Sequence, residues 1–196
     1  MKNRLIYQSS CYDCGPTSVL NGIRYLFERE KIPPVIIKKI FAMGLDAFNE
    51  NGEPGKSGTS KASMRYMADW FNDYSEKCGF PIKAAFLDMD RAVLEKDGEI
   101  LSCIQKGGCA IVRVWLEKAG HYVLLTQQLS EDTIGVFDPY EKEPESEDPD
   151  RKWIDDDPYH RNREVRLSIF NQSDDADYAM GEPAKREVLL LWRTEG

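Results

Sequence analysis

Hydrophobic residues recur at helical spacing through the first part of the chain. Over residues 15 to about 30, apolar side chains return every three or four positions, which predicts a helix. Pro16 suits the first turn of this helix, and Asp13 or a neighbour is expected to cap it. The same spacing predicts two further helices, over residues 35–43 and about 59–78. The glycine-rich, polar residues between these two helices are expected to form a surface loop.

The second part of the chain changes to a pattern that is typical of strands. A strand is expected over residues 82–86, followed by a helical stretch over residues 89–105 with a break near Gly98. Five apolar or alternating segments then follow, each bounded by polar links, and they predict strands. These segments are CAIVRVWL (109–116), HYVLLTQQL (121–129), TIGVFDP (133–139), EVRLSIF (164–170) and REVLLLW (186–192).

This order of elements predicts an α+β fold, with N-terminal helices packed on a C-terminal, mostly antiparallel sheet. We expect a single domain over residues 1–196, with a helical half over about 1–105 and a sheet half over about 106–196. An acidic excursion over about 141–162 interrupts the strands. Residues 141–157 within it include nine acidic and three basic residues without apolar periodicity, which predicts an exposed segment.

Composition and charge narrow the class of partner. Hydrophobic residues make up 41% of the chain, which is enough for a core, and the net charge is −8. An acidic chain disfavours nucleic acid as a partner, because phosphate binding needs a basic face. No apolar run approaches the roughly 20 residues that span a bilayer, and the N-terminus has no apolar signal segment. A cytoplasmic protein without stable membrane insertion is therefore expected, and its oligomeric state is left open.

The five cysteines are expected to be reduced thiols. Their number is odd and the chain is not small, so a disulfide framework is disfavoured. Cys11 and Cys14 form a C-x-x-C pair, a spacing that also occurs in redox sites and in half of a zinc site. A zinc site needs two further ligands, and the sequence has neither a second such pair nor paired histidines.

Cys14 has the sequence context of an activated nucleophile. It precedes Gly15 at the predicted start of a helix, where unpaired amides and a partial positive charge favour a thiolate. His121 opens one predicted strand and Asp138 closes the next, so the carboxylate can orient the imidazole if both lie at the same end. Gln8, six residues before the thiol, offers a carboxamide donor to a developing oxyanion, together with the Cys14 amide.

Three short motifs carry a resemblance to a known family. The segments QSSCYDCGP (8–16), HYV (121–123) and VFDP (136–139) resemble, in order and spacing, the papain-like bacteriocin-processing peptidases, which cut leader peptides after a double glycine. The resemblance implies a papain-like fold and a cysteine peptidase that acts on a peptide or protein substrate without a cofactor. It also implies a catalytic set made of Cys14, His121, Asp138 and Gln8.

Other interpretations of the same residues remain open. Cys14 alone can be a buried structural thiol, and Asp138 before Pro139 can simply start a turn. His160 is the competing base, although its polar surroundings favour a solvated side chain. The leading hypothesis is a cysteine peptidase or amidase that works through a thioester acyl-enzyme. Its rivals are an acyltransferase with the same triad and a non-catalytic module that binds peptides.

Overall fold

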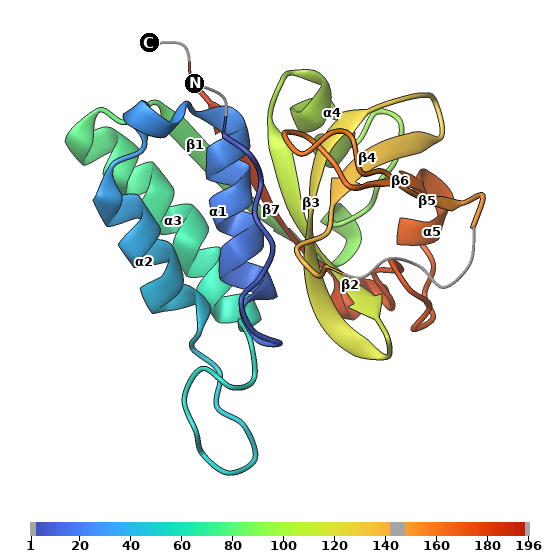
Figure 1. Ribbon diagram of the computed structural model, residues 1–196, viewed down its shortest axis with the longest axis horizontal. Helices are drawn as coiled ribbons and strands as arrows, with labels where there is room; N and C mark the ends of the chain where they lie inside the picture. Colours follow the sequence, from blue (N-terminus) through green and yellow to red (C-terminus); the bar gives the residue numbers. More distant parts are fainter. Residues whose placement is uncertain (1–2, 142–147, 195–196) are drawn as a thin grey trace.

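The computed structural model describes residues 3–141 and 148–194 (Figure 1). Its α-helices are α1 (Cys14–Leu26), α2 (Pro34–Gly44), α3 (Lys61–Cys78), α4 (Glu99–Gln105) and α5 (Leu167–Phe170), and its 3-10 helices are η1 (Arg29–Lys31), η2 (Met89–Arg91) and η3 (Pro183–Lys185). Its strands are β1 (Ile82–Asp88), β2 (Cys109–Leu116), β3 (Ala119–Gln128), β4 (Thr133–Phe137), β5 (Arg151–Trp153), β6 (Arg163–Arg166) and β7 (Glu187–Arg193).

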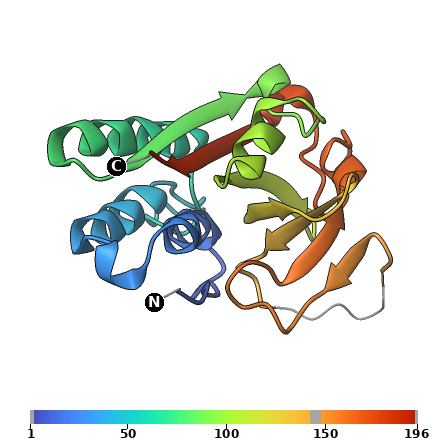
Figure 2. The same ribbon diagram turned by 90° about the horizontal axis from the view of Figure 1, so that it is seen from above.

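The described strands form one seven-stranded sheet in the order β1-β7-β2-β3-β4-β6-β5. All neighbours in this sheet pair antiparallel. Helices α1, α2 and α3 lie together on one side of the molecule, whereas α4 and α5 lie on the other side of the central strands (Figures 1 and 2). Helices combined with an antiparallel sheet confirm the predicted α+β class. A papain-like fold and the division into halves stay predictions.

Alternating side chains of the central strands separate two hydrophobic cores. On β2, Ile111 packs with the residues of α1, α2 and α3, whereas its neighbour Val112 packs with those of α4 and α5. On β7, Leu189 and Leu190 divide in the same way. Since successive residues of a strand point to opposite faces, this alternation is what allows helices to cover both faces of the sheet.

Helix α1 is the central helix of the first core. Every residue from Cys14 to Ile23 is buried, including the polar side chains of the first turns. Ser18 donates to the backbone oxygen of Tyr122 on β3 at 2.9 Å, which satisfies its buried hydroxyl. Gly22 lets the helix approach the sheet closely, because an added Cβ there would lie 3.1 Å from Leu191. The thiol at the start of α1 is thereby held against β3.

The N-terminal segment joins the helices to the sheet side of the molecule. The Asn21 carboxamide pairs with both the amide and the carbonyl of Ile6, at 2.9 and 2.8 Å. Two residues further on, the Gln8 amide donates to the carbonyl of Pro139 at 2.8 Å. The backbone of Gln8 therefore lies beside the turn that follows β4, next to Asp138.

Three predicted elements differ from the structure. The segment 164–170 forms a strand only as far as Arg166, and its last four residues form α5. Of the predicted helix over 89–105, only α4, which begins after Gly98, is an α-helix. The acidic excursion includes a short strand, β5, because its backbone pairs with β6. Residues 142–147 of that excursion lie outside the described residues.

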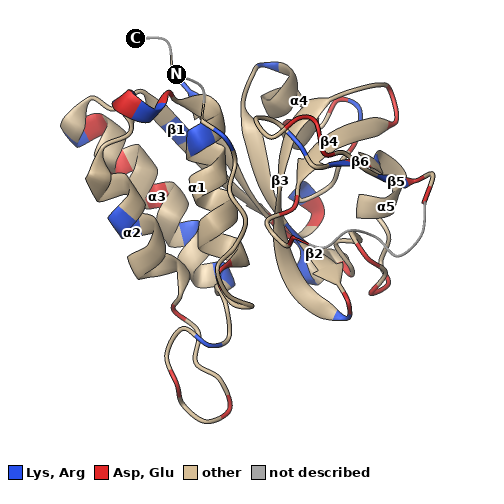
Figure 3. Cartoon of the chain, in the orientation of Figure 1, with Lys and Arg blue, Asp and Glu red and all other residues tan. Residues whose placement is uncertain are grey.

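No helix in the described part of the chain combines the length and the apolar character needed to cross a membrane. The predicted cytoplasmic location stays a prediction. Basic and acidic residues are interspersed over both sides of the molecule (Figure 3).

Replacement of Phe71 tests the core between the helices and the sheet. Phe71 lies in the middle of α3 and is fully buried. We expect Phe71→Ala to lower the free energy of unfolding by about 3–5 kcal/mol, because it removes apolar contacts and leaves a cavity. Denaturant unfolding measures the change. The control Asp69→Ala, at an exposed position of the same helix, should change it by less than about 0.5 kcal/mol; equal effects would contradict the assigned core.

Candidate active site

Cys14 is the first residue of α1, and a turn organised by Asp13 positions it. The Asp13 carboxylate accepts hydrogen bonds from the amides of Ser9 and Ser10, at 3.0 and 2.7 Å. Burial alone would raise the pKa of Asp13, but these hydrogen bonds hold it below its ordinary value. Asp13 stands at the N-cap position of α1, as predicted, but its side chain makes no capping hydrogen bond to a helix amide. Instead it fixes the turn that leads to the thiol.

His121 and Asp138 come together where β3 and β4 separate. The two strands pair as far as Leu124 and Phe137, where β4 ends, while the part of β3 before Leu124 pairs with β2. His121 Nε2 donates to Asp138 Oδ1 at 2.7 Å, and the two side chains are only 8% and 2% exposed. The sequence prediction that Asp138 orients His121 thus matches a direct contact in the structure.

The Cys14 thiol lies beside the imidazole of His121, since its interaction with the ring contributes to raising the pKa of His121. Because Asp138 occupies Nε2, Nδ1 is the nitrogen left to face the sulfur. Burial lowers the pKa of His121, but the interactions of the ring with Asp138 and Cys14, through hydrogen bonding and charge, outweigh it and raise the pKa to about 10. The imidazole is therefore held protonated at neutral pH, between a carboxylate and a sulfur that can carry negative charge.

Four hydrogen bonds hold Asp138 in place from residues that the sequence patterns do not indicate. The Tyr178 hydroxyl donates to Asp138 Oδ2 at 2.6 Å, and the Tyr140 amide donates to Oδ1 at 2.9 Å. Asn162 pairs with both the amide and the carbonyl of Asp138, each at 2.8 Å. Burial would raise the pKa of Asp138, but the hydrogen bond and charge of His121, with the Tyr178 and Tyr140 bonds, lower it.

Gln8 lies close to the site but does not point a donor into it. Its backbone is fixed beside Asp138 through Pro139, whereas its side-chain Nε2 donates to the carbonyl of Ser10 at 2.8 Å. Its Oε1 is buried and has no hydrogen-bond partner among the described residues. The Cys14 amide, at the start of a helix, has no acceptor within that helix and is available to a ligand. The part of Gln8 in an oxyanion hole stays a prediction.

The competing candidates lie apart from this contact. His160 Nδ1 pairs with Asp157 Oδ1 at 2.6 Å, and its ring lies edge-on to Tyr25 near the other end of α1. Cys11 is an exposed free thiol in the turn before Cys14. Within residues 3–141 and 148–194, no group of three or more His, Cys, Asp or Glu side chains is placed to hold a metal ion.

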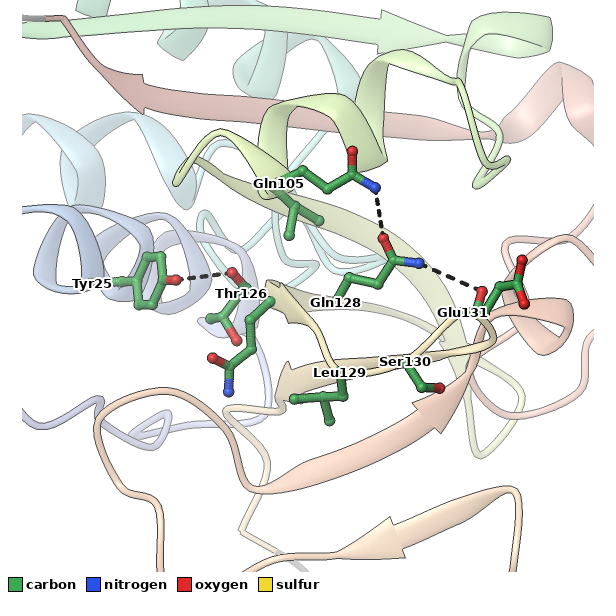
Figure 4. Close-up of a pocket in the computed structure, with 9 residues that line it drawn as sticks. Tyr25, Gln105, Thr126, Gln128, Leu129, Ser130 and Glu131 are labelled. Carbon is green, nitrogen blue, oxygen red and sulfur yellow. Dashed lines mark hydrogen bonds between the residues drawn. The ribbon is translucent and has the colours of Figure 1, made fainter.

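An open pocket of about 530 Å³ also lies well away from Cys14 (Figure 4). Gln105 donates to Gln128 at 2.8 Å on its rim, and Tyr25 donates to the carbonyl of Thr126 at 2.9 Å. Tyr25 follows Cys14 by eleven positions on α1, roughly 16 Å at the helical rise. The pocket therefore belongs to the other end of the helix and is not part of the candidate active site.

No model of a known protein family matches this sequence, and a search of curated proteins finds no match. The function must therefore be inferred from the geometry of the site.

The charge state of His121 can be measured directly. Its pKa of about 10 depends on Asp138, since burial by itself favours the neutral ring. We expect Asp138→Asn to lower this pKa, because the substitution removes the negative charge that stabilises the imidazolium. Nitrogen-15 NMR titration of the ring reports it. In the unmodified protein the ring should remain protonated at pH 8.

Asp157→Asn is the matched control, because it alters the same kind of Asp–His pair at His160. It should leave the titration of His121 unchanged. A His121 ring that titrates alike with and without the Asp138 carboxylate would show that the contact does not set its charge.

Proposed function

We propose that the chain is a papain-like cysteine hydrolase that cleaves peptide or amide bonds through a thioester acyl-enzyme. The observation that carries this proposal is the buried contact of His121 with Asp138, with Cys14 at the start of α1 close enough to raise the pKa of the same imidazole. A thiol at a helix N-terminus and beside a protonated imidazole is in the setting in which cysteine acts as a nucleophile. A structural thiol needs neither the imidazole nor the carboxylate behind it.

The activation of Cys14 follows from charge. The His121 imidazolium and the N-terminus of α1 both favour the thiolate over the neutral thiol. Asp138 holds the ring in one orientation and stabilises its positive charge, as the acid does in other catalytic triads. The sulfur is therefore available as a nucleophile near neutral pH without an external base.

The reaction then follows from the positions of the two groups. The Cys14 sulfur attacks the substrate carbonyl carbon, and a tetrahedral intermediate forms with a negative oxygen. As the C–N bond breaks, His121 gives its proton to the leaving amine and a thioester remains on Cys14. Water then attacks the thioester, His121 takes a proton from it, and the acid product leaves as the thiol is restored. An amine in place of that water would make the same site an acyltransferase, and product analysis with an added amine distinguishes the two reactions.

The overall arrangement supports the same family. A helical side that provides the nucleophile and a sheet side that provides the base and its acid are the features that papain-like hydrolases share. Here the thiol starts α1, while His121 and Asp138 belong to β3 and the end of β4. The peptidase family that the motifs resemble uses this division of roles.

Selective alkylation of Cys14 tests the activated thiolate. At pH 6.5 an ordinary thiol is only roughly 1% ionised, given a pKa of about 8.5. We expect iodoacetamide at this pH to modify Cys14 at least about ten times faster than Cys78, although Cys14 is buried and Cys78 exposed. Peptide mass spectrometry after brief exposure measures both rates.

The His121→Ala variant should lose this selectivity while Cys78 reacts as before. If Cys14 in the unmodified protein reacts no faster than Cys78, the proposed activation is wrong.

Cleavage itself is tested with a peptide library derived from a whole proteome. The unmodified chain should generate new peptide termini that Cys14→Ala does not. Cys109→Ala is the matched control, since it removes a buried thiol elsewhere in the same core. Peptide-binding without any new termini would favour a non-catalytic module instead.

The proposed role of Gln8 makes a separate kinetic prediction. We expect Gln8→Ala to lower kcat by roughly 10²–10³ if its carboxamide turns to donate to the oxyanion. Alkylation of Cys14 by iodoacetamide should change little, because that reaction develops no oxyanion. The control Gln105→Ala, on the rim of the remote pocket, should leave both rates unchanged. Equal kcat in Gln8→Ala and the unmodified protein would remove Gln8 from the catalytic set.

A further inference from the structure

The guanidinium of Arg113 lies beside the candidate active site. Arg113 is on β2 and pairs in register with Tyr122 on β3, next to the pair of Val114 with His121. Its terminal nitrogen packs so closely over Gly120 that a Cβ at position 120 would collide with it. Gly120 directly precedes His121, so the cation is held against the backbone that carries the proposed catalytic base.

A second route of contacts links Arg113 to the thiol. Glu187 on β7 lies within 3.7 Å of Arg113 and accepts the Tyr122 hydroxyl at 2.7 Å. Tyr122 shares its core with Cys14, and its hydroxyl lies 3.5 Å from the carbonyl of Thr59. Thr59 in turn fills the space where Gly15 lacks a side chain. Arg113 and Glu187 therefore lie on the same side of the sheet as Cys14.

Arg113 has donors to spare. Its side chain is 26% exposed. Besides its packing over Gly120, it lies 3.7 Å from Glu187 and 5.4 Å from the ring centroid of Trp115. The first distance is too long for a hydrogen bond. A planar guanidinium carries five N–H donors in a fork that matches a carboxylate. This fork is held in one place by packing and is left without an acceptor among the described residues.

Glu187, the carboxylate opposite Arg113, is itself incompletely hydrogen-bonded. Glu187 is 5% exposed at its side chain, and its Oε2 has no hydrogen-bond partner among the described residues. Burial raises the pKa of Glu187 despite the Tyr122 hydrogen bond and the charges of Arg113 and Lys61. Asp88, the other acid here, is shared by Lys61 at 3.3 Å and Arg65 at 2.8 Å. Three cations, Arg113, Lys61 and Arg65, are therefore paired with two carboxylates, those of Glu187 and Asp88.

We propose that Arg113 is a specificity-determining residue that binds a substrate carboxylate close to the scissile bond. The carboxylate comes from an Asp or Glu side chain or from the C-terminus of a short peptide. A charge-assisted, bidentate contact at a half-buried guanidinium discriminates more strongly than one in water. The proposal rests on the proposed peptidase function, but one of its two tests does not require turnover.

The first test uses paired alkylating probes. Chloroacetyl-glutamic acid α-amide and chloroacetyl-glutamine α-amide differ only by a side-chain carboxylate, and chloroacetyl-glutamine free acid places the carboxylate at the C-terminus instead. The Cys14 sulfur displaces chloride from each probe and forms a thioether. We expect one of the two acidic probes to react with Cys14 at least about ten times faster than the neutral probe, and the one that does identifies the source of the carboxylate.

Arg113→Gln should reduce that ratio to near one and leave the rate of the neutral probe unchanged. Arg91→Gln is the matched control, since it removes a surface arginine that pairs with Glu99 instead. If neither acidic probe alkylates Cys14 of the unmodified protein faster than the neutral probe does, the proposal is overturned, whatever the variants show. The proposal is also overturned if Arg113→Gln unfolds cooperatively and still alkylates faster with the acidic probe than with the neutral one.

The second test is the cleavage profile of the proteome-derived peptide library. The unmodified chain should favour peptides with Asp or Glu at one position near the cleaved bond, or with a free C-terminus near it, and Arg113→Gln should lose this preference. Cleavage without an acidic preference overturns the role of Arg113 but leaves the peptidase intact. Absence of any cleavage, with carboxylate-dependent alkylation retained, overturns the proposed function and leaves an anion-binding site beside Cys14.

Discussion

The buried pair of His121 and Asp138 is the interaction on which the site depends. Two charges that are almost inaccessible to water are costly unless other groups replace their hydration. Tyr178 and the Tyr140 amide supply that replacement at the carboxylate, and Asn162 fixes the backbone of Asp138. The chain beyond β4 therefore provides the hydroxyl that helps to keep a buried carboxylate ionised and the carboxamide that holds its backbone.

The separation of β3 and β4 makes room for this pair and for the nucleophile. From Leu124 to Gln128, β3 pairs with β4, and backbone hydrogen bonds occupy this edge of β3. Before Leu124, β3 no longer pairs with β4, and the Ser18 hydroxyl of α1 donates a hydrogen bond to the carbonyl of Tyr122. The same gap lets the start of α1 reach His121 and lets Asp138 turn towards it. One irregularity in a sheet thus brings together groups that are far apart in the sequence.

The long periodic elements, and the residues that meet at the candidate site, were predictable because each leaves a local signal. Helix α3 and strand β2 follow their hydrophobic periods, and Cys14 is marked by the glycine and proline after it. Helix α5 was predicted as a strand because four residues are too few to establish a helical period. Tyr178 could not be predicted, since it acts from an irregular segment in a left-handed conformation, with φ of 67°, that no periodicity reports.

Arg113 and Glu187 are charged residues at strand positions where the alternating pattern predicts apolar ones. Arg113 lies one step beyond the Val112–Val188 pair, on the face of the sheet that Ile111 and Leu189 turn towards the helices. Glu187 begins β7 on that same face. Alternation indicates that both side chains point inwards, where apolar residues are expected. A charge at an inward position is costly to bury alone, so two such charges on neighbouring strands have to be explained by each other or by a ligand. Because the 3.7 Å ion pair leaves both groups without full hydrogen bonding, the ligand is the better explanation.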